Sequence, residues 1–85
     1  MKIYYSSKFA KEYKRLPKKI KLLAEKKELV FRKNPHETSL KTHKLKGRLK
    51  NYFAFSINRE YRIIFEFRDT NTIWFLFVGT HGIYS

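Results

Sequence analysis

The sequence predicts an α+β fold in two layers, with an N-terminal strand, an αα-hairpin and then a three-stranded antiparallel meander. Apolar residues recur at helical spacing in the first 35 positions, whereas from position 52 onward they alternate at the period of two that is typical of strands. Two turn-like segments divide the second half into three runs. A chain of 85 residues is enough for one domain, residues 1–85.

The N-terminal half is predicted to contain one strand and two helices. Residues 2–5 (KIYY) are rich in strand-forming side chains. Ser6 or Ser7 supplies a hydroxyl that caps the first helix. Pro17 ends that helix and suits the first turn of the next, which we expect to run to about Asn34. The stripes that indicate the two helices are Phe9, Tyr13 and Leu16, and Ile20, Leu23, Ala24, Lys27, Val30 and Phe31.

The C-terminal half is predicted to contain three strands joined by turns at 58–60 and 69–71. In the first strand Phe53, Phe55 and Ile57 point to one face, and Tyr52, Ala54 and Ser56 point to the other. The second strand covers 61–67. The third covers 73–80 and begins with a run that is apolar on both sides, which predicts that both of its faces are covered. Residues 35–50 follow neither period, so we expect an irregular loop there.

The positive charge is concentrated in the first half of the chain. The net charge is +13; residues 1–50 carry seventeen Lys and Arg and four Glu, and residues 51–85 are balanced at three of each sign. A field of this size attracts polyanions, so nucleic acid or an acidic protein is the expected partner, with binding that weakens in salt. The alternative is a solvated lysine surface that only aids solubility.

Several classes of protein are disfavoured by composition. The chain has no cysteine, which fits a cytoplasmic protein and leaves no disulfide or thiolate metal site. No apolar run approaches the roughly 20 residues that span a bilayer, and no apolar segment typical of a signal peptide follows Met1. Histidines and carboxylates lack metal-ligand spacing, and no glycine-rich phosphate loop is present, so we expect neither a metal nor a small-molecule cofactor.

Arg62 is the first candidate functional residue, because it lies in a predicted strand whose alternate side chains are apolar. A charged side chain in such a strand needs a partner, since desolvating an unpaired charge is costly. Either Glu60 or Glu66 supplies an ion pair, or the guanidinium binds a phosphate.

Two histidines are the candidates for proton transfer. His81 follows Gly79-Thr80 at the end of the most apolar strand, and His43 lies in the basic loop. Cleaving RNA through its own 2′-OH requires one group that takes a proton and another that gives one. The alternative for each histidine is an ordinary polar surface residue. Tyr84 either stacks on a base or closes the core.

The side chains around these candidates are mostly cationic, and no acid lies between Thr38 and Lys50. We expect them to contact the phosphates and bases of RNA. The predicted RNA-binding residues are Lys41, Lys44, Lys46, Arg48, Lys50, Arg59 and Tyr61.

The order and spacing of these motifs resemble the RelE/ParE superfamily of bacterial type II toxins, most closely its mRNA-interferase branch of the YafQ kind. The motifs are HKLKG at 43–47, EYRIIF at 60–65, VGTH at 78–81 and the near-terminal Tyr84. The resemblance covers the whole chain. It implies a small microbial-ribonuclease-like sheet with a helical hairpin, and cleavage of translated mRNA on the ribosome, held in check by a tightly bound antitoxin.

Carried over by position, the resemblance implies catalytic roles for His43, Glu60, Arg62, His81 and Tyr84. Glu60 or His43 takes the proton from the 2′-OH, and Arg62 neutralises charge on the phosphoryl oxygens. His81 then protonates the leaving oxygen, and Tyr84 or Tyr61 stacks on the base.

The sequence departs from the pattern of the family at three places. Phe53 and Phe55 stand where some relatives have lysines, and Ser56 stands where others have a histidine. Only Gly82-Ile83 separates the last histidine from the terminal aromatic residue, one position fewer than is usual.

Three functions from different classes follow. The first is a ribosome-dependent mRNA endoribonuclease; the second is a ParE-type toxin that poisons DNA gyrase without catalysis, and the third is a basic RNA-binding module. The net charge also favours an acidic, partly disordered antitoxin as the protein partner, since such a chain can fold on a basic surface.

Overall fold

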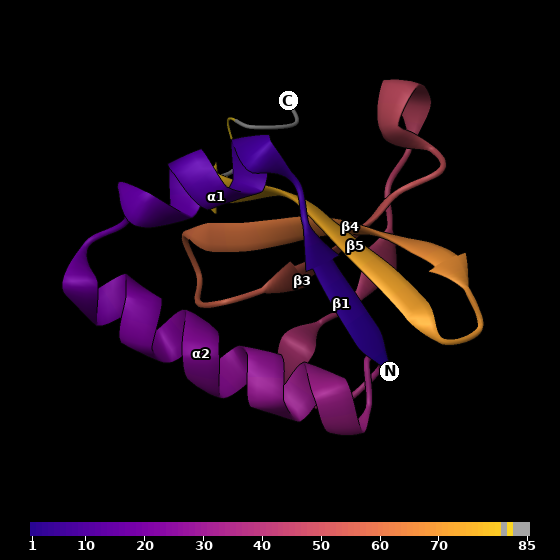
Figure 1. The fold of residues 1–85 in the computed structure, drawn as a ribbon, viewed down its shortest axis with the longest axis horizontal. Helices are drawn as coiled ribbons and strands as arrows, with labels where there is room; N and C mark the ends of the chain where they lie inside the picture. The colour runs from indigo at the N-terminus through magenta and orange to yellow at the C-terminus, as the bar shows by residue number, and fades with distance from the viewer. Residues whose placement is uncertain (81, 83–85) are drawn as a thin grey trace.

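In a computed structural model, two helices cover one face of a five-stranded sheet (Figure 1). The structure describes residues 1–80 and 82. The predicted α+β class, the αα-hairpin and the antiparallel meander are confirmed. The elements are β1 (Lys2–Tyr5), α1 (Ser7–Lys14), α2 (Lys18–Lys33), the 3-10 turn η1 (Thr38–Leu40), β2 (His43–Lys44), the 3-10 turn η2 (Gly47–Leu49), β3 (Phe53–Ser56), β4 (Tyr61–Asp69) and β5 (Thr72–Thr80).

The strand order in the sheet is β1-β5-β4-β3-β2, with β1 parallel to β5 and the other pairs antiparallel. The sequence did not predict β2, in which His43 lies opposite Ala54 and Lys44 lies opposite Phe53. A strand of two residues is too short to show a period of its own. The sheet therefore has one more strand than predicted, at the edge that carries the basic loop.

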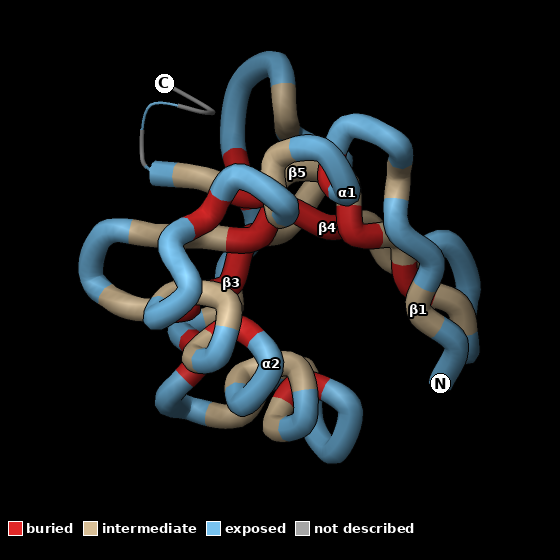
Figure 2. The backbone as a smooth tube through the Cα atoms, turned by 60° about the vertical axis from the view of Figure 1, so that its left-hand side comes forward, coloured by how far each residue is buried: buried red, intermediate tan, exposed pale blue. Residues whose placement is uncertain are grey.

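The main core lies between the helices and the sheet face that they cover, which we call the helix face (Figure 2). Phe31 of α2 is fully buried at its centre. Its ring centroid is 4.8 Å from that of Phe55, 4.9 Å from that of Phe65 and 5.4 Å from that of Phe75. These four rings join α2 to three neighbouring strands. The residues predicted to form the stripes of both helices pack here, with the exception of Lys27.

A bulge in β5 keeps its apolar residues on the helix face. Ile64 pairs with Phe77 and Phe65 pairs with Phe75, so Leu76 is an extra residue in β5. The extra residue shifts the alternation by one. Val78, three positions after Phe75, is therefore buried in the same core.

Beyond the end of β1, side chains at the start of α1 and within it form hydrogen bonds with the backbone of β5. The Ser6 hydroxyl accepts a hydrogen bond from Phe9 N (2.9 Å), which caps α1 as predicted, and donates one to Leu76 O (2.8 Å). A carboxylate oxygen of Glu12 accepts a hydrogen bond from Val78 N (3.0 Å). Two polar side chains of this segment thus satisfy backbone groups that an adjacent strand would otherwise pair.

The other sheet face, which we call the second face, has a smaller core of Leu45, Ala54 and Ile64, with Leu49, Tyr52 and Phe77 packed against it. Leu40 belongs to the core on the helix face and Leu45 to the core on the second face. The segment between them therefore passes around the edge of the sheet. Residues 38–50, predicted to be irregular, are held on both faces by leucines while their cations remain exposed.

We predict that Phe31→Ala destabilises the fold by about 3–5 kcal/mol, because it empties the centre of the aromatic core. Leu29→Ala is the matched control on the same helix; Leu29 is 64% exposed, so the expected change is within about 0.5 kcal/mol. Urea unfolding of both variants measures the difference. Equal effects of the two substitutions would contradict this description of the core.

We predict a pH-dependent role for Asp69 at the β4–β5 turn. The N–H of Asn71 donates to its carboxylate (2.8 Å), and this bond, with a further one from Thr72, lowers the pKa of Asp69. A lowered folded-state pKa stabilises the fold above the unfolded pKa, and the gain is lost as the pH falls through the folded pKa. The melting temperature of Asp69→Ala should therefore lie below that of the wild type at neutral pH, and the gap should close between about pH 5 and about pH 2.

Asp69→Asn is the control for that experiment, because an amide oxygen still accepts the bond from Asn71. It should lose less stability than Asp69→Ala. A gap between wild type and Asp69→Ala that stays constant through acid pH would contradict the assignment to the ionised carboxylate.

Candidate functional site

The register of the sheet brings His43 and Arg62 to the second face. His43 lies opposite Ala54, which belongs to the core on that face. Two residues along β3, Ser56 lies opposite Arg62. Because side chains alternate along a strand, Ser56 and Arg62 point to the same face as Ala54. Two of the predicted catalytic residues thus share one face, at the edge that carries the basic loop.

The separation of these two residues suits a substrate that lies between them. From His43 to Arg62 the path crosses two strand spacings and runs two residues along the strands. With spacings of about 4.8 Å and about 3.3 Å per residue, the Cα atoms lie about 12 Å apart. Side chains of this length can therefore reach one phosphodiester group from two directions without touching each other.

The imidazole of His43 is held in one tautomer. Its Nδ1 lies 2.9 Å from the carbonyl oxygen of Lys41. A carbonyl only accepts, so Nδ1 carries the proton and Nε2 is the basic nitrogen of the neutral ring. Lys41 has a left-handed backbone (φ 53°) at the end of η1, and this turn precedes the strand that carries His43. The side chain of His43 is exposed.

Arg62 is bound to the turn between β3 and β4. Its Nη1 donates to Asn58 O (2.7 Å), Arg59 O (3.2 Å) and Tyr61 O (3.2 Å). Of the ion-pair partners proposed from the sequence, Glu66 pairs instead with Arg68 (3.4 Å). Carbonyl groups of the preceding turn and of Tyr61 therefore hold the guanidinium in place.

Glu60 and Tyr61 do not share the second face with His43 and Arg62. Glu60 is exposed in the β3–β4 turn, where its backbone N–H donates to Asn58 Oδ1 (2.9 Å). Tyr61 is half-buried and packs against the core on the helix face. The ring of Tyr61 thus contributes to the core, whereas the carboxylate of Glu60 lies near Arg62 in the chain but outside the strand.

The predicted residues His81 and Tyr84 lie outside the described residues. The strand that leads to them is described up to Thr80, which lies opposite Tyr61. Gly79 lies opposite Arg62, so the β5 residue that is paired with Arg62 has no side chain.

The exposed cations of the basic loop spread along the edge of the sheet. Lys44 lies opposite Phe53, which points to the helix face. Lys46 precedes η2, and Arg48 lies within it. The structure thus separates the predicted RNA-binding residues into two groups, since Lys41 and Arg59 lie instead at a pocket with Arg62. The first group, Lys44, Lys46, Arg48 and Lys50, is exposed to solvent.

The pocket that is lined by Lys41, Arg59 and Arg62 has a volume of about 170 Å³, and we call it the turn pocket. It lies where α2, η1 and the β3–β4 turn meet. No function was predicted for Lys27 or Ser39, although the place of Lys27 within the apolar stripe of the second helix is a signal that separates it from the other lysines of that helix. The lining residues are Lys27, Ser39, Lys41, Ser56, Ile57, Asn58, Arg59 and Arg62.

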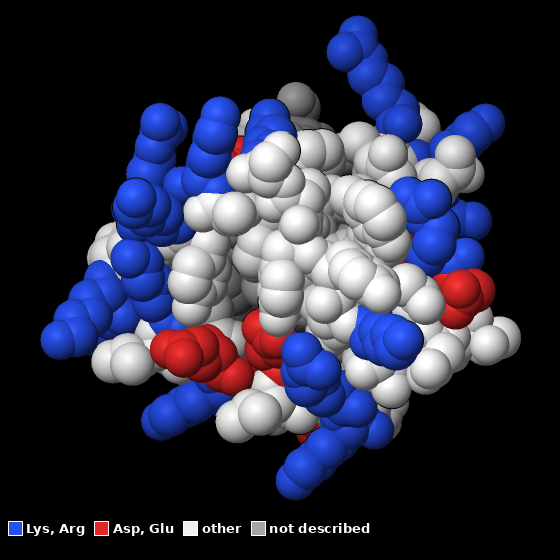
Figure 3. Space-filling view, viewed as in Figure 1, with Lys and Arg blue, Asp and Glu red and all other residues white. Residues whose placement is uncertain are grey.

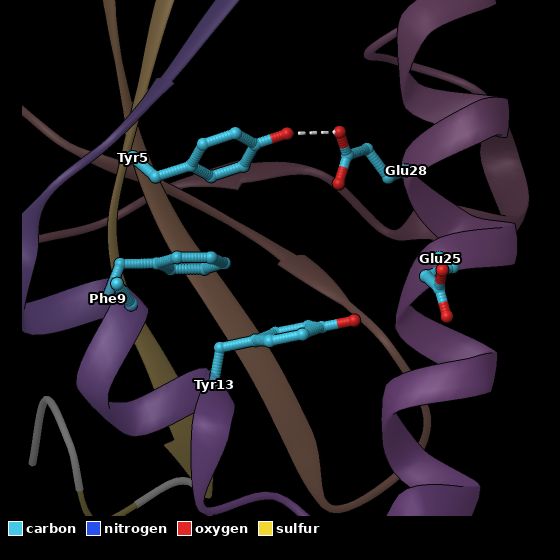
Figure 4. A pocket seen from close by; sticks show the side chains of 6 residues that line it. Tyr5, Phe9, Tyr13, Glu25 and Glu28 are labelled. Carbon is cyan, nitrogen blue, oxygen red and sulfur yellow. Dashed lines mark hydrogen bonds between the residues drawn. The ribbon is translucent and has the colours of Figure 1, made fainter.

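A larger cavity of about 390 Å³ lies between the two helices (Figure 4). Tyr5, Phe9 and Tyr13 form one wall, and Glu25 and Glu28 project from α2 on the other. The Tyr5 hydroxyl donates to a carboxylate oxygen of Glu28 (2.5 Å). Burial, and next this bond, raise the pKa of Tyr5.

The charges around the cavity between the two helices do not suit RNA. In Figure 3 most Lys and Arg lie toward the rim of the molecule and the centre of the visible face is uncharged; acidic side chains lie at its α2 side and again at the right-hand edge. Two carboxylates on the wall would repel phosphates. We therefore place the candidate nucleic-acid site at the second face and the turn pocket.

Within residues 1–80 and 82, no group of three or more His, Cys, Asp or Glu has a geometry that could hold a metal ion. In the same part of the chain, no helix combines the length and the apolar character needed to cross a membrane.

Comparison with known proteins gives both a family and a fold. The profile of a family described as "Bacterial toxin of type II toxin-antitoxin system, YafQ" matches residues 1–83. Among solved structures, the chain is similar to a YoeB/ParE toxin from Agrobacterium tumefaciens (TM-score 0.80, 16% identity, 95% of this chain and 99% of that chain covered). No curated protein matches the sequence.

Two solved complexes also contain similar chains. One is the E. coli DinJ–YafQ complex (TM-score 0.69, 24% identity, 96% of this chain and 94% of that chain covered). The other is the toxin–antitoxin complex RelBE2 from Mycobacterium tuberculosis (TM-score 0.77, 16% identity, 94% and 96% covered). At these identities the structural likeness shows the fold.

Proposed function

The chain belongs to the YafQ family of bacterial type II toxins, and from this premise we propose that it is an endoribonuclease that cleaves translated mRNA on the ribosome. The observation that carries the proposal is that His43 and Arg62 lie on the same sheet face, beside a basic loop. A base and a fixed cation on either side of a phosphodiester are what cleavage through the 2′-OH needs.

His43 is the general base in this proposal, rather than Glu60. Its Nδ1 donates to the Lys41 carbonyl, so Nε2 is free of a proton in the neutral ring and can accept one from a 2′-OH. Glu60 lies in the exposed turn, where its carboxylate is solvated. The 2′-oxygen then attacks the adjacent phosphorus, and the bond from phosphorus to the 5′-oxygen breaks.

Arg62 and His81 complete the reaction. The guanidinium of Arg62 stabilises the charge that builds up on the phosphoryl oxygens, and carbonyl groups of the turn hold it in place before the substrate arrives. His81 donates the proton to the leaving 5′-oxygen, and Tyr84 stacks on the exposed base. The products carry a 2′,3′-cyclic phosphate, or a 3′-phosphate after hydrolysis, and a 5′-OH.

An acidic antitoxin is the proposed protein partner. A relative is known in the DinJ–YafQ complex, and a chain with net charge +13 attracts an acidic segment that folds on it. Covering the exposed cations of the basic loop would also exclude mRNA. The proposal places the toxin in the cytoplasm, where translation occurs.

The fold also suits a ParE-type toxin that poisons DNA gyrase, because one similar structure is that of a YoeB/ParE toxin. Such a toxin needs neither histidine. A gyrase supercoiling assay separates the two functions, and we expect the purified chain to leave supercoiling unchanged.

We predict that His81→Ala relieves the growth arrest caused by expressing the chain without antitoxin. Removing a proton-transfer group should slow cleavage by about 100-fold or more. Growth after induction, and mRNA cleavage in a translating extract, measure the effect. Circular dichroism and thermal unfolding establish that the variant is folded.

His36→Ala is the matched control for that variant, because His36 is an exposed histidine that stacks on Phe67, with ring centroids 5.9 Å apart, away from the candidate site. It should remain as toxic as the wild type. Undiminished toxicity of a folded His81→Ala variant would count against the proposed catalysis. RNA binding without cleavage products in the wild type would instead support a binding module.

A further inference from the structure

The turn pocket is strongly cationic for its size. Among the described residues, eight line it; four of these are Lys or Arg, and none is acidic. Lys27 comes from α2, Lys41 from the end of η1, Arg59 from the β3–β4 turn and Arg62 from β4. Segments far apart in the sequence thus bring like charges together, which favours the binding of an anion.

The pocket exists because β2 stops before β3 does. The last pair between them is His43 with Ala54, so β3 continues without a partner strand at Ser56. Lys41, which has a left-handed backbone, ends η1 just before β2 begins. The result is an opening at the edge of the sheet, beneath the β3–β4 turn.

A backbone donor also faces this opening. Ile57 N donates to Tyr61 O on the β4 side, and Leu45 N donates to Tyr52 O on the β2 side. Backbone groups of successive residues point to opposite edges of a strand, so those of Ser56, like those of Tyr52, point away from β4. The N–H of Ser56 is therefore directed to the edge where the pocket lies, in a residue that is only 7% exposed.

Glu37, which precedes η1, is an acidic side chain that interacts with the charge of Lys27, and it is already hydrogen-bonded. Its carboxylate accepts hydrogen bonds from the N–H (2.7 Å) and the hydroxyl of Ser39. These bonds, with a smaller contribution from the charge of Lys27, lower the pKa of Glu37. Glu37 does not line the pocket, so it offsets part of the charge of Lys27 without occupying the space.

The volume of the pocket suits a small anionic group. About 170 Å³ corresponds to roughly five or six water molecules at about 30 Å³ each. That is enough for a phosphate group and a few waters. The donors, which are ammonium, guanidinium, amide and backbone N–H groups, match phosphate oxygens.

We propose that the turn pocket binds a single backbone phosphate of RNA, separate from the phosphate that is cleaved, and that Lys27 is the residue of α2 that holds it. This proposal rests on the proposed function for the identity of the ligand. Arg62 lines the pocket and also belongs to the candidate catalytic site, so a phosphate held here would fix the position of the neighbouring linkage relative to Arg62.

Titration of the isotopically labelled chain with inorganic phosphate, followed by NMR, tests the pocket independently of any cleavage. We expect saturable shifts of the amide signals of Ser39, Lys41 and Ser56. Lys27→Gln should weaken phosphate binding by about fivefold. Lys26→Gln is the matched control, because Lys26 is the adjacent exposed lysine of α2 and lies outside the pocket.

A second arm uses a short single-stranded RNA with the folded His81→Ala variant, so that the RNA stays intact. We expect the RNA to shift the same amide signals, and inorganic phosphate to compete with it. Adding Lys27→Gln should reduce the slope of log K against log salt by about 0.7, whereas adding Lys26→Gln should leave the affinity and slope nearly unchanged.

The outcomes separate the two proposals. Diffuse shifts without saturation, or equal effects of Lys26→Gln and Lys27→Gln, overturn the pocket while leaving ribosome-dependent cleavage intact. Phosphate binding at the pocket without competition by RNA overturns the identity of the ligand. Failure of the proposed function would show in a different experiment, in which a folded His81→Ala variant is as toxic as the wild type.

Discussion

The packing of four phenylalanine rings fixes the register of the sheet, and the rest of the site depends on that register. Phe31 joins α2 to Phe55, Phe65 and Phe75 on three adjacent strands. Because side chains alternate, a slip of one residue in β4 would bring Phe65 to the second face and Arg62 to the core. The energetic cost of that exchange determines where the guanidinium points.

The distribution of charge favours one edge of the sheet for RNA. The helix face of the sheet is sealed by the aromatic core, and the cavity between the helices is lined by Glu25 and Glu28. The exposed cations of residues 41–50 follow the opposite edge of the sheet, next to His43 and Arg62. The helices also carry exposed lysines, but residues 41–50 hold five Lys and Arg and no acid, which suits this edge to a phosphate backbone.

The periods in the sequence were sufficient for the helices and the long strands, because each spans several repeats. They were insufficient for β2, which has two residues, and for the parallel pairing of β1 with β5, which has no local signal. A signal was nevertheless present in the loop: Leu40, Leu45 and Leu49 stand among cations, and they pack on the two sheet faces. Leucines among lysines indicate a loop that is held in place.

For the site, the sequence identified His43 and Arg62 but could not identify their surroundings. The proton position on His43 depends on the left-handed turn at Lys41, and the turn pocket depends on where β2 ends. Both are consequences of tertiary structure. His81 and Tyr84 remain predictions that rest on the family resemblance, since they lie outside the described residues.

The most direct test of the central claim is the chemistry of the RNA ends after the chain is induced without antitoxin. Primer extension locates the cuts in translated mRNA, and end-group analysis identifies the termini. Attack by a 2′-OH between His43 and Arg62 predicts 5′-OH ends together with 2′,3′-cyclic or 3′-phosphate ends. Intact mRNA during growth arrest, or fragments with 5′-phosphate ends, would contradict the account.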